Sequence, residues 1–201
     1  MDLKELKKEV QQLPSIEQTT KQFKENWLKP YHKDTHIPKH FEFLKNLDPI
    51  TRAELNKRLA ETKQHLDTIG ENQILSEKLH QLTRQLVELK LTNFNGDTKK
   101  AKQITNRLIN DEVLSIAKTV EEINDFEERV AKISDHYQEI NTLLDKRLSL
   151  EEALYYMEIP HHRYLQTLQK TAQHHKTIAR AIERQFTAIT KESSLKNVPH
   201  K

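Results

Sequence analysis

Residues 165–189 read LQTLQKTAQHHKTIARAIERQFTAI and carry the most regular pattern in the chain. Apolar residues, with one histidine among them, recur there at alternating intervals of three and four. They are Leu165, Leu168, Ala172, His175, Ala179, Ile182, Phe186 and Ile189. That alternation places about one side chain per turn on a single face of an α-helix, as in coiled coils. The stretch therefore predicts a helix from Pro160 to about Glu192 that buries one face.

Two longer segments upstream show the same periodicity. The first, 48–93, opens with an acidic residue and a proline, a pair that favours a helix start. Its second half carries a leucine stripe: Leu75, Leu79, Leu82, Leu86 and Leu89. The second, 98–147, carries an apolar line from Ile116 to Leu144. Helices of this length are held together mainly by burying such faces, so both segments should pack against other helices.

A tight turn separates the two segments. Residues 93–97 read NFNGD, in which Gly96 tolerates left-handed backbone and Asp97 can cap the next helix. Matched lengths around such a turn predict a long antiparallel helical hairpin over 48–147. We expect one unbroken helix through Gly70, with a chain reversal there as the alternative. The second segment contains neither glycine nor proline inside it and predicts a single helix of about 50 residues.

The whole chain of 201 residues predicts an elongated all-α fold, a coiled-coil-like bundle around this hairpin. Glycine occurs only twice and charged residues make up 31%, and regular apolar spacing at that composition is typical of long helices. We expect short N-terminal helices in 1–47 and the hairpin in 48–147. A capped short helix and the long basic C-terminal helix should follow in 148–192, and 193–201 should be a frayed tail.

Several classes of function are disfavoured by what the sequence lacks. There is no cysteine, hence no disulfide, thiolate zinc site or cysteine nucleophile. No phosphate-binding glycine loop or other catalytic motif occurs, so we expect no enzyme activity and no cofactor. No apolar run reaches ~18 residues, and the charged N-terminus is unlike a signal peptide. We therefore expect no transmembrane insertion and a cytoplasmic location.

Eleven histidines raise the question of a metal site. Three of them are spaced four residues apart: His32, His36 and His40. Two histidines at that spacing can share a metal on one helix face, but Pro38 interrupts the helix here. Glu77 and His80 have the Glu-x-x-His spacing of di-iron bundles but lie away from the leucine stripe. The sequence therefore predicts no metal site.

Charge is unevenly spread, although the net charge is only +3. Ten acidic and three basic residues lie in 111–145, against two acidic and eight basic residues in 160–201. Either these segments attract each other across a bundle, or the basic one faces an external anion. Five basic residues form a ridge opposite the apolar face of the last helix: Arg163, Lys170, Arg180, Arg184 and Lys191. This ridge is either a solvated face or a site for nucleic-acid phosphates or anionic lipid.

A corner precedes the last helix. Residues 149–152, SLEE, form a capping box, and Ile159-Pro160 ends the short helix that follows. On Ser149, Glu151, Glu152, Ala153, Ile159 and Pro160, the stretch 149–169 resembles the helix–turn–helix of excisionase-type DNA-binding domains. The resemblance implies contacts to DNA from His161, His162, Arg163 and Gln166. The chain departs from that family because Glu158 replaces the corner glycine and the second helix is much longer. The alternative is a structural corner between packed helices.

Together these patterns favour a non-enzymatic scaffold or adaptor that binds another protein or associates with itself. The contact seam is expected on the apolar face of the last helix, at Leu165, Leu168, Ile182, Phe186 and Ile189. The alternative function is a nucleic-acid-binding protein that uses the corner over 149–169 and the basic ridge.

Overall fold

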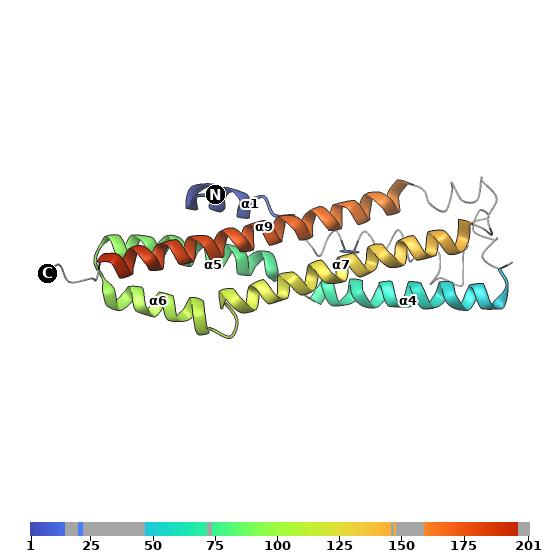
Figure 1. Ribbon diagram of the computed structural model, residues 1–201, viewed down its shortest axis with the longest axis horizontal. Helices are drawn as coiled ribbons and strands as arrows, with labels where there is room; N and C mark the ends of the chain where they lie inside the picture. Colours follow the sequence, from blue (N-terminus) through green and yellow to red (C-terminus); the bar gives the residue numbers. More distant parts are fainter. Residues whose placement is uncertain (15–19, 22–46, 72–73, 146, 148–158, 197–201) are drawn as a thin grey trace. The chain divides into compact units, whose positions relative to one another are not determined.

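The computed structural model describes residues 1–14, 20–21, 47–71, 74–145, 147 and 159–196. Within these ranges the protein has six helices and no strand, which confirms the predicted all-α fold (Figure 1). They are α1 (Leu3–Gln11), α4 (Pro49–Glu71), α5 (Leu75–Phe94), α6 (Thr98–Asn110), α7 (Ile116–Asp145) and α9 (Ile159–Lys196). Apart from a helical turn at Thr20–Lys21 and a bend at Leu47, the short helices expected over 15–47 lie outside the described residues.

Two helix starts show how short-range side chains define the ends. α4 begins at Pro49 as predicted, and the Asp48 carboxylate accepts a hydrogen bond from the Thr51 amide at 3.3 Å. α1 begins with a capping box, in which Asp2 accepts from the Glu5 amide and Glu5 accepts from the Asp2 amide. Each carboxylate satisfies an amide that has no partner inside the helix.

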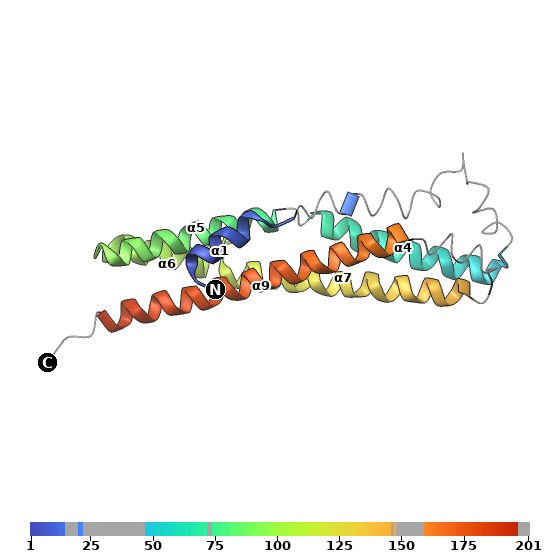
Figure 2. The ribbon, with the colours of Figure 1, turned by 90° about the horizontal axis from the view of Figure 1, so that it is seen from above.

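The predicted turn between α5 and α6 is also confirmed. Gly96 has φ of 75°, in the left-handed region that costs a residue with a Cβ atom about 1–2 kcal/mol. The Asp97 carboxylate then accepts a hydrogen bond from the Lys100 amide at 3.1 Å, which caps α6. This turn reverses the chain, and α5 and α6 pack side by side (Figures 1 and 2).

The prediction of a single helix through the second long segment is wrong, because α6 and α7 are separate. The Asp111 carboxylate accepts hydrogen bonds from the amides of Val113 at 2.8 Å and Leu114 at 2.7 Å. The Ser115 hydroxyl then accepts from the Lys118 amide at 3.1 Å. Side chains that bond nearby amides compete with the helical ladder, so Asp111 stabilises the break and Ser115 caps the next helix.

The unbroken helix expected through Gly70 is wrong as well. Gly70 lies within α4, which ends at Glu71, and a separate α5 begins at Leu75; residues 72–73 lie outside the described part. At 3.6 residues per turn, the apolar residues on either side of this junction would point in nearly opposite directions on one continuous helix. The two halves therefore need different neighbours, and α4 and α5 belong to different compact units.

The first unit comprises residues 1–14, 74–125 and 173–201. α5 is its centre, because both α1 and α6 pack against it (Figures 1 and 2). The leucine stripe of α5 is completely buried, together with Leu6 and Val10 of α1. The described part of the unit also buries apolar residues from α6, α7 and α9: Ala101, Ile104, Leu108, Ile116, Ile123, Ile178, Ala179, Ala181, Ile182 and Ile189. The predicted stripe is thus a true core face.

The second unit comprises residues 15–73 and 126–172. Within it, α4 runs beside the later part of α7 (Figure 1). Its buried apolar residues include Leu55, Leu59, Leu66 and Ile69 of α4; Phe126, Val130, Ile133, Tyr137, Ile140 and Leu144 of α7; Leu165, Leu168 and Ala172 of α9. Those of α7 and α9 belong to the predicted apolar faces. Gln169 of α9 donates a hydrogen bond to the Ser134 hydroxyl of α7 at 3.4 Å.

Threonine is common among the buried helical residues of both units. The hydroxyls of Thr62, Thr83, Thr119 and Thr171 each donate to the carbonyl four residues earlier. That bond satisfies a polar group that would otherwise cost free energy in the core. These helices can therefore bury threonine without needing a polar partner on a neighbouring helix.

Candidate functional site

The predicted interaction seam is described at all five of its residues. Leu165 and Leu168 are buried in the second unit, and Ile182 and Ile189 are buried in the first. None of these four is more than 4% exposed, whereas Phe186 is half-buried. These four side chains belong to the core of their own chain. Contact with another chain through the seam stays a prediction.

The predicted anion-binding ridge lies on the exposed side of α9. The side chains of Lys170, Arg180, Arg184 and Lys191 are all exposed. Arg163 belongs to α9, but its side chain lies outside the described part. Of the stretch 149–169 that resembles a helix–turn–helix, residues 149–158 also lie outside the described part, and the rest belongs to α9. The described face of α9 thus presents four cations along about six turns of helix.

A second apolar surface, which the sequence analysis missed, lies on α5. We call it the α5 stripe: Val87, Leu91 and Phe94. Leu91 is 58% exposed and Phe94 is 82% exposed, while Val87 is half-buried. At 3.6 residues per turn, the three share one face of α5, about 120° around the helix from the buried leucine stripe. Large apolar side chains at helical spacing are thus open to a partner.

The α5 stripe leads into a groove between α1 and α5, which we call the α5 groove. Its volume is about 450 Å³, and its lining includes Val10 of α1 with Thr83, Val87 and Leu91 of α5. Val10 and Thr83 are buried, and the Thr83 hydroxyl donates to the Leu79 carbonyl at 2.8 Å. The floor therefore presents methyl groups rather than an unsatisfied hydroxyl, which suits an apolar occupant.

The edges of the α5 groove carry an excess of positive charge. Lys7 of α1 and Arg84 of α5 line the groove with exposed side chains. Among the described residues, neither has an ion-pair partner. The acidic lining residue Glu88 lies 3.1 Å from the Lys100 ammonium, so its charge is already matched. A ligand in the groove would meet an apolar floor and two cations, one from α1 and one from α5.

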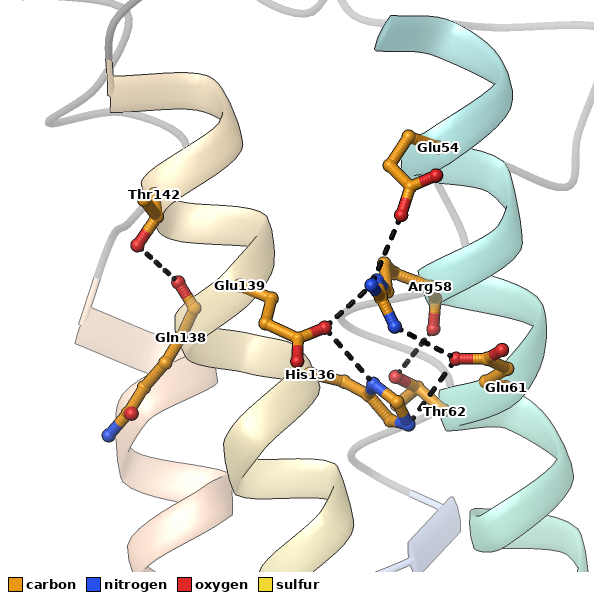
Figure 3. Close-up of polar contacts among 8 residues, drawn as sticks. All are labelled: Glu54, Arg58, Glu61, Thr62, His136, Gln138, Glu139 and Thr142. Carbon is orange, nitrogen blue, oxygen red and sulfur yellow. Dashed lines mark hydrogen bonds and ion pairs between the residues drawn. The ribbon is translucent and has the colours of Figure 1, made fainter.

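A polar cluster joins α4 to α7 in the second unit (Figure 3). The Arg58 guanidinium lies 2.8 Å from the Glu139 carboxylate, 3.1 Å from Glu54 and 3.5 Å from Glu61. The His136 ring lies between two of these carboxylates, 3.5 Å from Glu61 and 3.6 Å from Glu139. Because three carboxylates already occupy the donors of Arg58, the cluster links two helices rather than presenting a reactive group.

His65 stacks on His136 next to this cluster. Their ring centres are 5.8 Å apart, and the planes differ by 20°. A guanidinium nitrogen of Arg129 lies 3.3 Å from the His65 Nδ1. Arginine can only donate, so Nδ1 must accept and the ring must be neutral. Burial lowers the pKa of His65 below its usual value, and the charges of Arg129, His136 and Lys132 lower it further, while Glu61 opposes them.

Neither a metal centre nor a membrane span is present in the described ranges. No three histidine, aspartate or glutamate side chains there are placed to hold a metal ion. Glu77 is exposed and His80 lines the α5 groove, whereas the three spaced histidines of the N-terminal region lie outside these ranges. None of the described helices combines the length and the apolar character needed to cross a bilayer.

Part of this candidate site had a signal in the sequence. Val87, Leu91 and Phe94 are spaced by four and three, which is as regular as the leucine stripe of the same helix. The two patterns interleave, and the leucine stripe is the longer of the two, so periodicity favours it as the buried face. No known protein family, curated protein or solved structure matches this chain.

Proposed function

We propose that the protein is a non-enzymatic adaptor that binds another protein through the α5 stripe and the α5 groove. The observation that supports this is the exposure of Leu91 and Phe94, in line with Val87 and beside a groove with an apolar floor. Contiguous exposed apolar side chains, unlike single ones, are typical of surfaces that bind a partner. Anchors at helical spacing next to a groove also match the way one helix recognises another.

A double substitution, Leu91→Glu with Phe94→Glu, tests this function. Both residues are exposed, so the free energy of unfolding should change by no more than about 0.5 kcal/mol each. Each substitution places a charge where the partner needs an apolar side chain, and binding should fall at least tenfold. The measurement is quantitative mass spectrometry of proteins retained by the immobilised chain.

The matched control is Ile50→Glu. Ile50 is 83% exposed and lies on α4 in the second unit, so one apolar-to-glutamate change of the same kind is made away from the α5 stripe. A partner should be retained by this control and by the unmodified chain but lost by the double variant. Equal retention by all three proteins would exclude the α5 stripe as the interaction surface.

We infer nucleic-acid binding by the ridge of α9 as the second candidate function. The exposed cations Lys170, Arg180, Arg184 and Lys191 favour it, because phosphate contacts come mainly from such side chains. The exposed Gln173 lies on the same face of α9 as these cations, but the four cations are the side chains suited to phosphate, so this function would consist mainly of backbone contacts that are independent of sequence.

A further inference from the structure

We propose that the occupant of the α5 groove is an amphipathic helix of a partner protein, with apolar anchors flanked by acidic residues. This inference rests on the proposed function and adds the chemistry of the partner. Three features of the first unit carry it: the length of the apolar surface, the charges at its edges, and the consequence of those charges for self-association.

The length of the surface matches a short helix. From His80, at one end of the groove lining, to Phe94, at the end of the α5 stripe, α5 rises about 21 Å, or about four turns. Val87, Leu91 and Phe94 occur once per turn along this face. A partner helix that lies alongside α5 can place an apolar side chain at each turn and bury these anchors, as in other helix-in-groove complexes.

The positive charges at the edges of the α5 groove favour a partner helix with acidic residues on its flanks. Lys7 comes from α1 and Arg84 from α5, so cations from both helices border the groove. Glu88 is matched by Lys100 inside the chain, which leaves the positive charges of Lys7 and Arg84 in excess. Carboxylates on the flanks of a partner helix would therefore be attracted, and ammonium groups at the same places would be repelled.

The same charges disfavour a second copy of this chain as the occupant. In a symmetric dimer the same surface meets its own copy, so two patches with the same excess of positive charge, from Lys7 and Arg84, would be brought together. Like charges brought together at an interface cost free energy and suppress that pairing. A partner of different composition avoids this repulsion.

Selection from a displayed peptide library tests the proposal with the full chain. The library consists of helical peptides of about 18 residues with leucine fixed at alternating intervals of four and three. The flanking positions vary among Glu, Gln and Lys. We expect Glu to exceed Lys at the flanks by at least about threefold after selection at low salt. The excess should shrink at 0.5 M salt, because exposed pairs are screened.

Two variants separate this inference from the proposed function. The charge reversals Lys7→Glu and Arg84→Glu, made together, should reverse the preference so that Lys exceeds Glu among the selected peptides. The Leu91→Glu and Phe94→Glu variant should enrich no peptides, whatever their flanks. Light scattering of each protein accompanies the selection and reports self-association.

Each outcome has a definite meaning. Peptides that depend on Leu91 and Phe94 but show no Glu excess would overturn the acidic partner and leave the proposed function standing. Failure to enrich any peptide on the unmodified chain, or equal enrichment on the Leu91→Glu and Phe94→Glu variant, would overturn both. A dimer that the same variant dissociates would instead identify a second copy as the occupant.

Discussion

His65 shows how burial and neighbouring charges together lower the pKa of a side chain. Its Nδ1 lies 3.3 Å from an Arg129 donor, and its ring stacks on His136. A proton on Nδ1 would replace that hydrogen bond with two opposed donors and add a cation beside Arg129 and Lys132. The folded state therefore favours neutral His65, and its pKa lies below the usual value.

This shift predicts how stability depends on pH. An unfolded chain binds a proton at His65 near the usual pKa of 6.5, while the folded chain binds it only at lower pH. Stability is therefore fully present above about pH 6.5 and is lost as the pH falls through the folded pKa. His65→Asn keeps an acceptor near the position of Nδ1 but cannot titrate, so this variant should lose less stability on acidification.

Urea unfolding at pH 8 and at pH 5 measures this difference. At pH 8 both proteins have a neutral group at this position, and the comparison there gives the structural cost of the substitution alone. The difference between the two pH values should then be larger for the unmodified chain. An equal or larger loss in His65→Asn would show that His65 is not the group responsible.

Some helix ends and turns that depend on single residues were predictable from the sequence, and others were not. The roles of Asp48, Gly96 and Asp97 were predictable, because capping and left-handed turns depend on the residue and its immediate neighbours. Asp111 and Ser115 are the same kind of local signal, but the apolar line that starts at Ile116 favours a continuation of the preceding helix over a break. Local side-chain competition with the helix, rather than glycine or proline, made that break.

At the scale of helices, one ion pair in the first unit joins α5 to α7. Both carboxylate oxygens of Glu122 lie within 2.8 Å of the Lys78 ammonium, and Lys78 is only 8% exposed. A cation in such a place depends on its partner, since water reaches it poorly. Glu122→Ala should therefore lower the free energy of unfolding by about 1–3 kcal/mol.

A small set of variants isolates this interaction by urea unfolding. Lys78→Met removes the charge and keeps an apolar chain of similar length, so it should cost less than Glu122→Ala. Adding Glu122→Ala to Lys78→Met should then cost almost nothing more. The exposed pair Glu88–Lys100 is the control, and Glu88→Ala should cost less than about 1 kcal/mol. Additive losses from Lys78 and Glu122 would show that the pair does not act as a unit.

α5 also explains why the candidate site was only partly predictable. Its leucine stripe was recognised because five leucines repeat without exception, and all five are buried. The α5 stripe has the same spacing, but periodicity reveals faces and not which of two faces is covered. Only the packing of α1 and α6 against α5 shows that Leu91 and Phe94 remain exposed.

For the whole molecule, the sequence specified the class of fold but not the assembly of its helices. The first unit combines residues 1–14, 74–125 and 173–201, and the second combines 15–73 with 126–172. One aliphatic helix face can pack against many others, so periodicity alone cannot show which helices are neighbours. The α5 groove has the same origin, since one wall comes from α1, far from α5 in the sequence. The sequence of α5 alone therefore could not predict that α1 forms the other side of the groove.

Nucleic-acid binding by the positive charges of α9 can be tested through its dependence on salt. The ridge of α9 offers four described cations, Lys170, Arg180, Arg184 and Lys191. If all four contact phosphates, the affinity for duplex DNA should fall about a hundredfold between 50 and 200 mM salt, from a slope of about −3.6 on logarithmic axes. Changing the four to alanine should abolish a gel shift at low salt.

A variant with equal charge loss elsewhere controls for net charge. Lys57, Lys63, Lys99 and Lys102 are also exposed, and changing them to alanine should weaken DNA binding only slightly. The salt dependence also ranks the two proposed functions, because binding through four phosphate contacts alone is weak at cellular salt. The apolar α5 stripe loses none of its contribution under those conditions. A DNA complex that persisted at 200 mM salt and required the ridge would reverse that ranking, since it would need contacts beyond those four cations.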